Sequence, residues 1–149
     1  MSLSTIRSEI KSIMEDISEI GKVYDYLRWD ESSWEGFFNL FKTDSTQHGW
    51  MITRISTTED RRFETEHNLR NYTFKIIGFY PLKDKSATEK TFQDLIETVC
   101  STFRTNYNLN GTCLDSDPPE VTIVENRIYG SILAHYTEIL LRVRERITL

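Results

Sequence analysis

The chain has 149 residues, of which 38% are hydrophobic and 12% aromatic, a composition typical of a folded domain and not of a disordered chain. No apolar run approaches the ~20 residues of a membrane-spanning helix, and the first residues lack the basic and apolar regions of a signal peptide. The net charge is −5 with scattered lysines and arginines, so neither membrane binding nor specific nucleic-acid binding is expected. We expect one domain over residues 1–149.

The first predicted element is a helix over about residues 4–20. Its apolar residues recur at steps of three and four, which places them on one face of a helix. They are Leu3, Ile6, Ile10, Ile13, Met14, Ile17 and Ile20. Gly21 follows where a helix-ending glycine belongs. The same stripe could pair as a coiled coil, but it is too short to favour that.

An aromatic segment follows a short extended stretch over residues 23–26. Asp30 is a plausible N-cap, and the spacing of Trp34, Phe37, Phe38 and Phe41 predicts a short helix or an irregular aromatic segment. Such a cluster is more often part of a core than of a ligand site. If it is exposed, it indicates a contact with another protein.

Two strands are predicted next, over residues 50–56 and 71–80, and together they form a hairpin. In the second strand Tyr72, Phe74 and Ile76 share one face. The intervening segment, residues 57–68, is charged, mixed in sign and poor in apolar residues. It is either a solvated loop or an arm that reaches a neighbouring subunit.

A second helix is predicted over residues 87–107, opened by a capping box from Ser86 to Glu89. Apolar alternation then predicts a strand over residues 120–126, a turn over 126–130 and a long strand over 131–147. A helix is the rival interpretation of the last segment, but the alternation from Ile139 to Arg146 favours a strand.

These elements predict an α+β fold in the order α-β-β-α-β-β. We expect an antiparallel sheet of about four strands with two long helices packed on one face. The other face carries Lys75, Arg142 and Arg144 among aromatic residues, so it is only partly apolar.

The histidines and cysteines show no pattern typical of a metal site. His48 and His67 lie near the two ends of the predicted hairpin, where they can approach each other, whereas His135 stands alone in the last strand. Cys100 falls on the apolar side of a helix and Cys113 in a loop. We expect both to be reduced.

No other motif indicates chemistry. Asp115 and Asp117, with Glu120 nearby, resemble the start of a calcium loop, but two prolines interrupt the pattern. A glycine-rich phosphate loop and a nucleophile elbow are both missing from the sequence. We therefore expect no cofactor, no metal and no enzymatic activity.

Several stretches resemble a known family. They are Ile20–Val23, Gly49–Ile55, Phe103–Gly111, Pro118–Val121 and Leu133–Ile139. Together with the order of elements, they resemble the tail-terminator and head–tail-joining proteins of long-tailed phages and prophages. The resemblance implies a homo-oligomeric ring, commonly a hexamer, that ends the tail tube and meets the head connector. It also implies no cofactor, a location in the virion tail or neck, assembly in the bacterial cytoplasm, and a lumen through which DNA can pass.

The interface of such a ring is expected in the hairpin segment at Arg61, Arg62, Phe63 and Glu64. The alternative function is a non-catalytic α+β ligand-binding or adaptor module, which a deep apolar pocket between sheet and helices would favour. An enzyme would instead be favoured by a pocket that contains acids or histidines with shifted pKa values.

Overall fold

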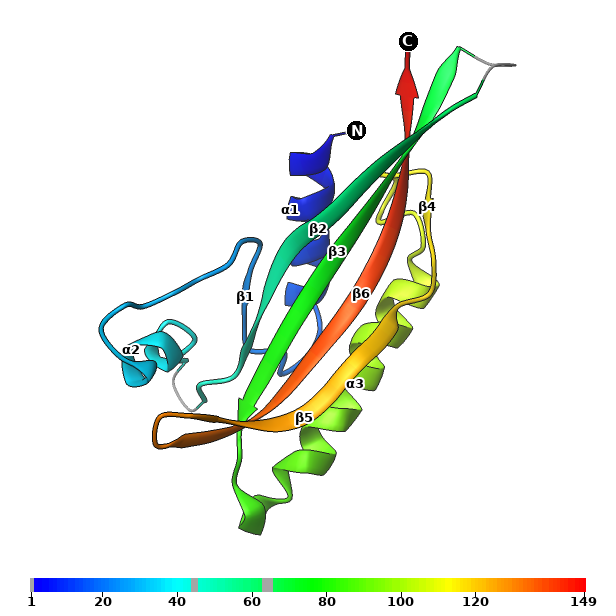
Figure 1. Ribbon diagram of the computed structural model, residues 1–149. Helices are drawn as coiled ribbons and strands as arrows, with labels where there is room; N and C mark the ends of the chain where they lie inside the picture. The colour runs from blue at the N-terminus through cyan, green and yellow to red at the C-terminus, as the bar shows by residue number, and fades with distance from the viewer. Residues whose placement is uncertain (1, 44–45, 63–65) are drawn as a thin grey trace.

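The computed structural model describes residues 2–43, 46–62 and 66–149 (Figure 1). Its elements in chain order are α1 (Leu3–Glu15), β1 (Lys22–Tyr24), α2 (Trp34–Asn39), β2 (Gly49–Arg61), β3 (His67–Pro81), the 3-10 turn η1 (Asp84–Ser86), α3 (Thr88–Thr105), β4 (Asp115–Ser116), β5 (Glu120–Tyr129) and β6 (Ile132–Thr148). Within these ranges no helix is both long enough and apolar enough to cross a membrane.

The strands form one curled, mixed sheet of six strands (Figure 1). Its order is β1-β2-β3-β6, and both β4 and β5 pair with the outer side of β6. Only β1 and β2 run parallel; every other pair is antiparallel. The longest ladder joins β3 to β6 and runs from His67 opposite Thr148 to Pro81 opposite Ala134.

The predicted fold class is wrong. The sheet has six strands and is mixed, where about four antiparallel strands were expected. The described residues form three α-helices, and the six-residue α2 was no part of the expected two-helix layer. The extra strands β1 and β4 have three and two residues, which is too short to show the alternation by which a strand is recognised.

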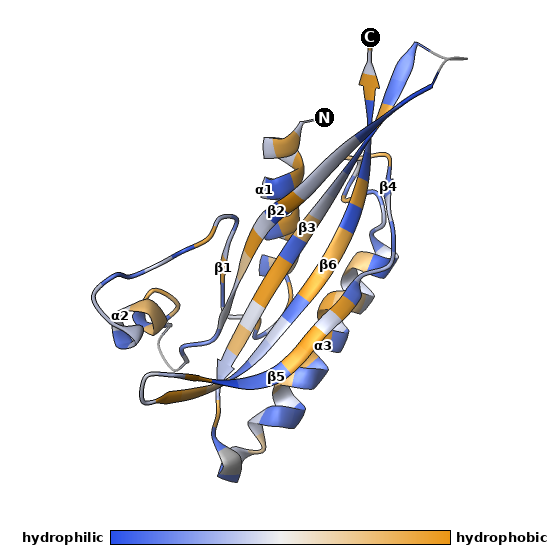
Figure 2. Ribbon diagram, viewed as in Figure 1, coloured by the Kyte–Doolittle hydropathy of each residue, from blue (hydrophilic) through white to orange (hydrophobic). Residues whose placement is uncertain are grey.

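The main core lies between one face of the sheet and the two longer helices, α1 and α3. On β3 this face carries Tyr72, Phe74 and Ile76, all buried, as the alternation predicts. Trp50 of β2 is also fully buried there, and its indole Nε1–H donates to the carbonyl of Ile20 at 3.0 Å. Figure 2 shows the matching alternation of hydrophobic and hydrophilic residues along β6.

A second, smaller core lies on the opposite face of the sheet, where α2 packs. Phe37, Phe38 and Phe41 contact Phe79 of β3, with ring centroids 5.4, 5.2 and 4.5 Å apart. Phe79 and its neighbours alternate with the residues of the main core, so they face the other way. The prediction that this aromatic segment is part of a core is confirmed for these three residues, although Trp34 remains exposed.

Two of the predicted helix caps are wrong. Ser33, and not Asp30, caps α2, because its Oγ accepts from the N–H of Gly36 at 2.9 Å. The capping box at α3 does not form: Ser86 belongs to η1, and the N-cap is Ala87, which makes no side-chain cap bond. The backbone of Ala87 is left-handed (φ 50°), so the chain turns sharply there before α3 begins.

Candidate functional site

Arg61 and Arg62 of the predicted interface lie at the outer end of the β2–β3 hairpin, which we call the β2–β3 arm (residues 54–62 and 66–74). Strand β6 pairs with β3 from His67 to Phe74, so only the β2 side of the arm is an edge. In Figure 1 the arm extends beyond α1 and α3. Every residue of β2 from Arg54 to Arg61 is exposed. The parallel partner β1 reaches only Met51, so beyond that point β2 has no strand on its outer edge among the described residues.

Charged side chains tie the two strands of the arm together. Arg70 pairs with Glu59 at 2.9 Å, and the side-chain amide of Asn68 also donates to Glu59. The bond from Asn68 and the nearby guanidinium of Arg70 lower the pKa of Glu59. Asp60 accepts from Asn71 at 3.2 Å. Several of the arm's charges are therefore used across its own strands.

The described part of the predicted interface is Arg61 and Arg62. Arg61 is the last residue of β2 and pairs with Asn68 of β3, and both arginines are exposed. Phe63 and Glu64 lie outside the described residues. The interface therefore stays a prediction, now placed at the end of the arm.

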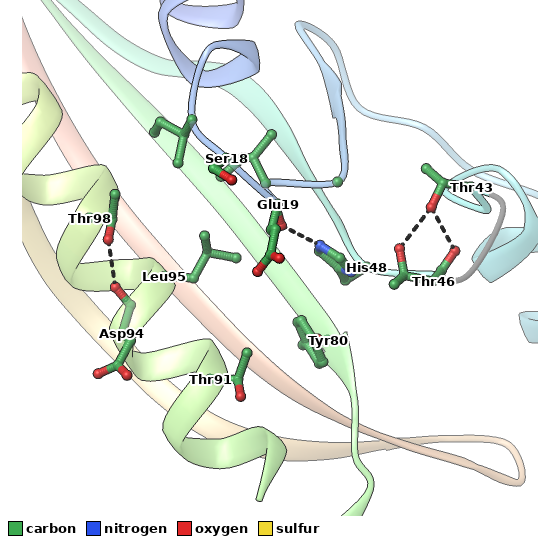
Figure 3. A pocket seen from close by; sticks show the side chains of 13 residues that line it. Ser18, Glu19, Thr43, Thr46, His48, Tyr80, Thr91, Asp94, Leu95 and Thr98 are labelled. Atoms are coloured by element: carbon green, nitrogen blue, oxygen red, sulfur yellow. Dashed lines mark hydrogen bonds between the residues drawn. The ribbon is translucent and has the colours of Figure 1, made fainter. Parts of the chain in front are cut away.

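A groove lies between α3 and the loop that joins α1 to β1 (Figure 3). Its volume is about 770 Å³. His48 stands in its wall, where Nε2–H donates to the carbonyl of Glu19 at 2.8 Å and the ring stacks on Tyr80 at 4.5 Å. A side chain at Gly21 would collide with His48, because its Cβ would lie 2.5 Å from the His48 carbonyl oxygen. The glycine therefore makes room for the histidine.

Most of the side chains that line the groove are polar. Besides His48 and Tyr80, hydroxyl and carboxylate groups line it, from Ser18, Glu19, Thr43, Thr46, Thr91, Asp94 and Thr98 (Figure 3). The apolar side chains in its wall are Ile17, Ile20 and Leu95. This is not the deep apolar pocket that would favour the ligand-binding alternative.

His48 and His67 do not meet. Because β2 and β3 are antiparallel, residue 48 lies at one end of the hairpin and residue 67 at the other. His67 instead lies beside Thr148, with Nδ1 3.3 Å from the hydroxyl oxygen.

A cluster of hydrogen-bonded polar side chains surrounds His135, which is only 4% exposed. Its Nε2 lies 2.9 Å from the hydroxyl oxygen of Thr88, and its Nδ1 lies 2.8 Å from Oδ1 of Asn126. All three residues line one cavity of about 330 Å³. A hydroxyl, an imidazole and an amide oxygen thus form one hydrogen-bonded chain at its wall.

The fold brings the three residues together from separate elements. Asn126 and His135 are directly paired across the β5–β6 hairpin. Thr88 is the first residue of α3, directly after the left-handed Ala87, and its hydroxyl accepts from the N–H of Lys83 at 2.9 Å. The ring of His135 also stacks on Phe92, one turn further along α3.

Burial lowers the pKa of His135, and the nearby carboxylate of Glu89 only partly opposes this. The pKa of His135 is therefore lower in the folded protein than in the unfolded chain, where the pKa of a histidine is near 6.5. On acidification the unfolded chain binds the proton first, so the free energy of unfolding falls as pH decreases from about 6.5 through the lower pKa of the folded state. Urea unfolding from pH 7.5 to 5 would measure this fall, and His135→Gln is expected to make it shallower. An equal fall in both proteins would contradict the assignment.

Few features of the sequence pointed to this cluster. His135 was predicted to stand alone, and Thr88 and Asn126 were not singled out. The available signal was the predicted hairpin between the last two strands, but its turn was placed too early, over residues 126–130. The observed turn lies between Tyr129 and Ile132, and this register sets Asn126 opposite His135. Nothing local in the sequence links either residue to Thr88, which reaches the sheet only through tertiary packing.

The other candidate groups have structural partners. Asp115 and Asp117 both pair with Arg144, the latter at 2.9 Å, and in the described part of the chain no three acidic, histidine or cysteine side chains converge to hold a metal. Cys100 and Cys113 are free and buried. Burial raises the pKa of both thiols, that of Cys113 to about 11. Neither is a reactive thiolate at neutral pH.

Comparison with known proteins does not assign the chain to a family. A scan against protein-family models and a search of curated proteins both give no match.

Proposed function

We propose that the chain is a structural protein that assembles with copies of itself into a closed ring, in the manner of a phage or prophage tail terminator. The observation that carries this proposal is the β2–β3 arm, in which the exposed edge strand β2 runs beside β3 beyond the helix-covered body (Figure 1). The sequence resemblance described above agrees with it.

The arm suits self-association for a physical reason. The outer edge of β2 presents backbone N–H and C=O groups with no strand beside them, and such edges pair readily with other chains. A contact between the arm of one copy and a different surface of the next is heterologous, and heterologous contacts close into rings when the rotation between copies permits.

The partners follow from this role. The chain would bind itself, most commonly as a hexamer, and would meet a tail-tube protein on one side and a head connector on the other. The net charge of −5 agrees with a lumen through which DNA slides without being gripped. The working location would be the virion tail or neck, after assembly in the bacterial cytoplasm.

Reversing both arginines at the end of the arm tests the proposal. Arg61→Glu with Arg62→Glu is expected to weaken self-association about tenfold or more, because a charged contact is turned into a repulsive one. Sedimentation velocity over a range of concentrations would measure the change, and circular dichroism would show that the fold is kept.

The matched control reverses two other exposed residues, Lys42→Glu with Lys85→Glu, which changes the net charge equally but lies away from the arm. It is expected to assemble like the parent protein. A parent protein that stays monomeric at high concentration would reject the ring, whereas an arm variant that assembles normally would reject the arm as its interface.

A further inference from the structure

The cavity of about 330 Å³ beside the start of α3 holds an arrangement that ring assembly does not use. Thr88, His135 and Asn126 line it together with Ala87, Glu89 and Lys90. The hydroxyl, imidazole and amide are joined by the contacts of 2.9 and 2.8 Å described above. In this order they match a nucleophile, a general base and the group that orients the base.

We propose that this cavity is an acyl-transfer site, in which Thr88 is the nucleophile, His135 the general base and Asn126 the residue that positions His135. This inference does not depend on the ring, and it departs from the expectation that the chain has no enzymatic activity. Its support is the geometry of the three side chains and the cavity that they share.

The hydrogen-bond inventory fixes where the protons lie. Oδ1 of Asn126 can only accept, so it takes the proton of His135 Nδ1 and leaves a lone pair on Nε2. The hydroxyl of Thr88 accepts from the N–H of Lys83, and its own proton has two acceptors within reach, Nε2 of His135 at 2.9 Å and the carbonyl of Lys83 at 3.3 Å. The base that would remove the proton is therefore the nearer of the two acceptors.

The backbone around Thr88 adds two features that such a site needs. Ala87, directly before it, has left-handed dihedrals (φ 50°, ψ 45°), which are uncommon for a residue with a side chain and often mark functional sites. Thr88 is itself the first residue of an 18-residue helix, and the N-terminal end of a helix favours negative charge, such as that which develops on an acyl oxygen.

The proposed reaction balances without any further reagent. The oxygen of Thr88 attacks the carbonyl carbon of an ester while its proton passes to Nε2 of His135, and the carbonyl electrons move to the oxygen. The intermediate collapses, the C–O bond to the leaving alcohol breaks, and the alcohol takes the proton from His135. Water then attacks the acyl group on Thr88, His135 accepts the proton of the water, and the regenerated threonine takes it back. A cavity of about 330 Å³ has room for a small ester with a short acyl chain.

The test starts with the unaltered protein and p-nitrophenyl acetate. We expect release of p-nitrophenolate and, by peptide mass mapping after a brief exposure, an acetyl group on Thr88. The rate should rise with pH as His135 loses its proton, with a midpoint below 6.5. Thr88→Ala and His135→Gln are expected to lose about 100-fold or more of the rate.

Conservative changes separate a catalytic role from a structural one. Thr88→Ser keeps the hydroxyl and is expected to keep the acetyl adduct. Asn126→Asp is expected to keep activity with the midpoint of the pH profile raised, because a carboxylate stabilises the charged imidazole, whereas Asn126→Ala should lose about 10-fold or more. Thr91→Ala, a change at an exposed threonine of the same helix, is the matched control and should match the parent protein.

Several outcomes would overturn the proposal. Acetylation confined to surface lysines of the unaltered protein would do so, and so would equal rates for the parent protein and Thr88→Ala. Circular dichroism of each variant shows whether it folds. If Thr88→Ala unfolds, the site of the adduct on the parent protein and on Thr88→Ser still decides the question. The result is independent of sedimentation, so failure here leaves the ring untouched.

Discussion

Replacing Trp50 with alanine is expected to lower the free energy of unfolding by about 3–5 kcal/mol. The side chain is 0% exposed and lies in the main core between the sheet and the two longer helices. Its loss creates a cavity and also leaves the carbonyl of Ile20 without the indole donor at 3.0 Å. Urea unfolding followed by circular dichroism would measure the change.

Gly78 provides a sharper form of the same test. A Cβ added there would lie 2.3 Å from Cζ3 of Trp50, so Gly78→Ala should destabilise the parent protein but cost much less when Trp50 is already alanine. Trp29→Ala, at an exposed indole, is the control and should change stability by about 0.5 kcal/mol or less. Additive effects of the changes at Trp50 and Gly78 would contradict this packing.

Phe38→Ala should have a comparable effect on the second core, again about 3–5 kcal/mol. The ring is 1% exposed and contacts Phe79 and Tyr129, with centroids 5.2 and 5.5 Å apart. These contacts hold α2 against the sheet, and a six-residue helix has little stability of its own. The variant should therefore expose α2 to hydrogen exchange before the rest of the fold.

Trp34→Ala is the matched control, because Trp34 starts the same helix but is exposed. We expect a much smaller loss of stability, since less apolar area is buried there. If the two variants lose equal stability, α2 is not held by its buried face.

The parts of the fold that were predictable from the sequence are those with long apolar periods. The helix predicted over residues 87–107 is α3, and the buried face of β3 carries Tyr72, Phe74 and Ile76 as expected. In both elements the core-facing residues repeat often enough for the period to be unmistakable.

The ends of the other elements depend on tertiary packing, which no local sequence pattern indicates. The predicted first helix ends five residues early, at Glu15, although Ile17 and Ile20 still pack against the core. Both strands of the hairpin are longer than their apolar residues indicate: β2 continues through the charged segment from Thr57 to Arg61, and β3 begins at His67. Cross-strand ion pairs and hydrogen bonds stabilise this part of the hairpin. The charged residues of this segment do not indicate which face or edge of the strand packs against the rest of the protein.

The candidate acyl-transfer site was hidden from sequence reasoning for a similar reason. Its three groups come from α3, β5 and β6, and the separation between Thr88 and His135 along the chain is 47 residues. No motif of fixed spacing joins them. Only the register of the β5–β6 hairpin and the turn at Ala87 bring them within hydrogen-bonding distance.

The position of β6 in the sheet has a consequence for biosynthesis. This strand lies between β3 on one side and β4 and β5 on the other, so it supplies a partner to three strands made before it. On the ribosome, β3 can pair with β2 but must wait for residues 132–148 to emerge before its second edge is covered. Completion of the sheet is thus a late event with large loops to close, and folding is expected to be slow compared with that of helical domains of this length. A nascent chain halted before β6 would expose apolar strand edges, and it is at this stage that chaperones would be needed most.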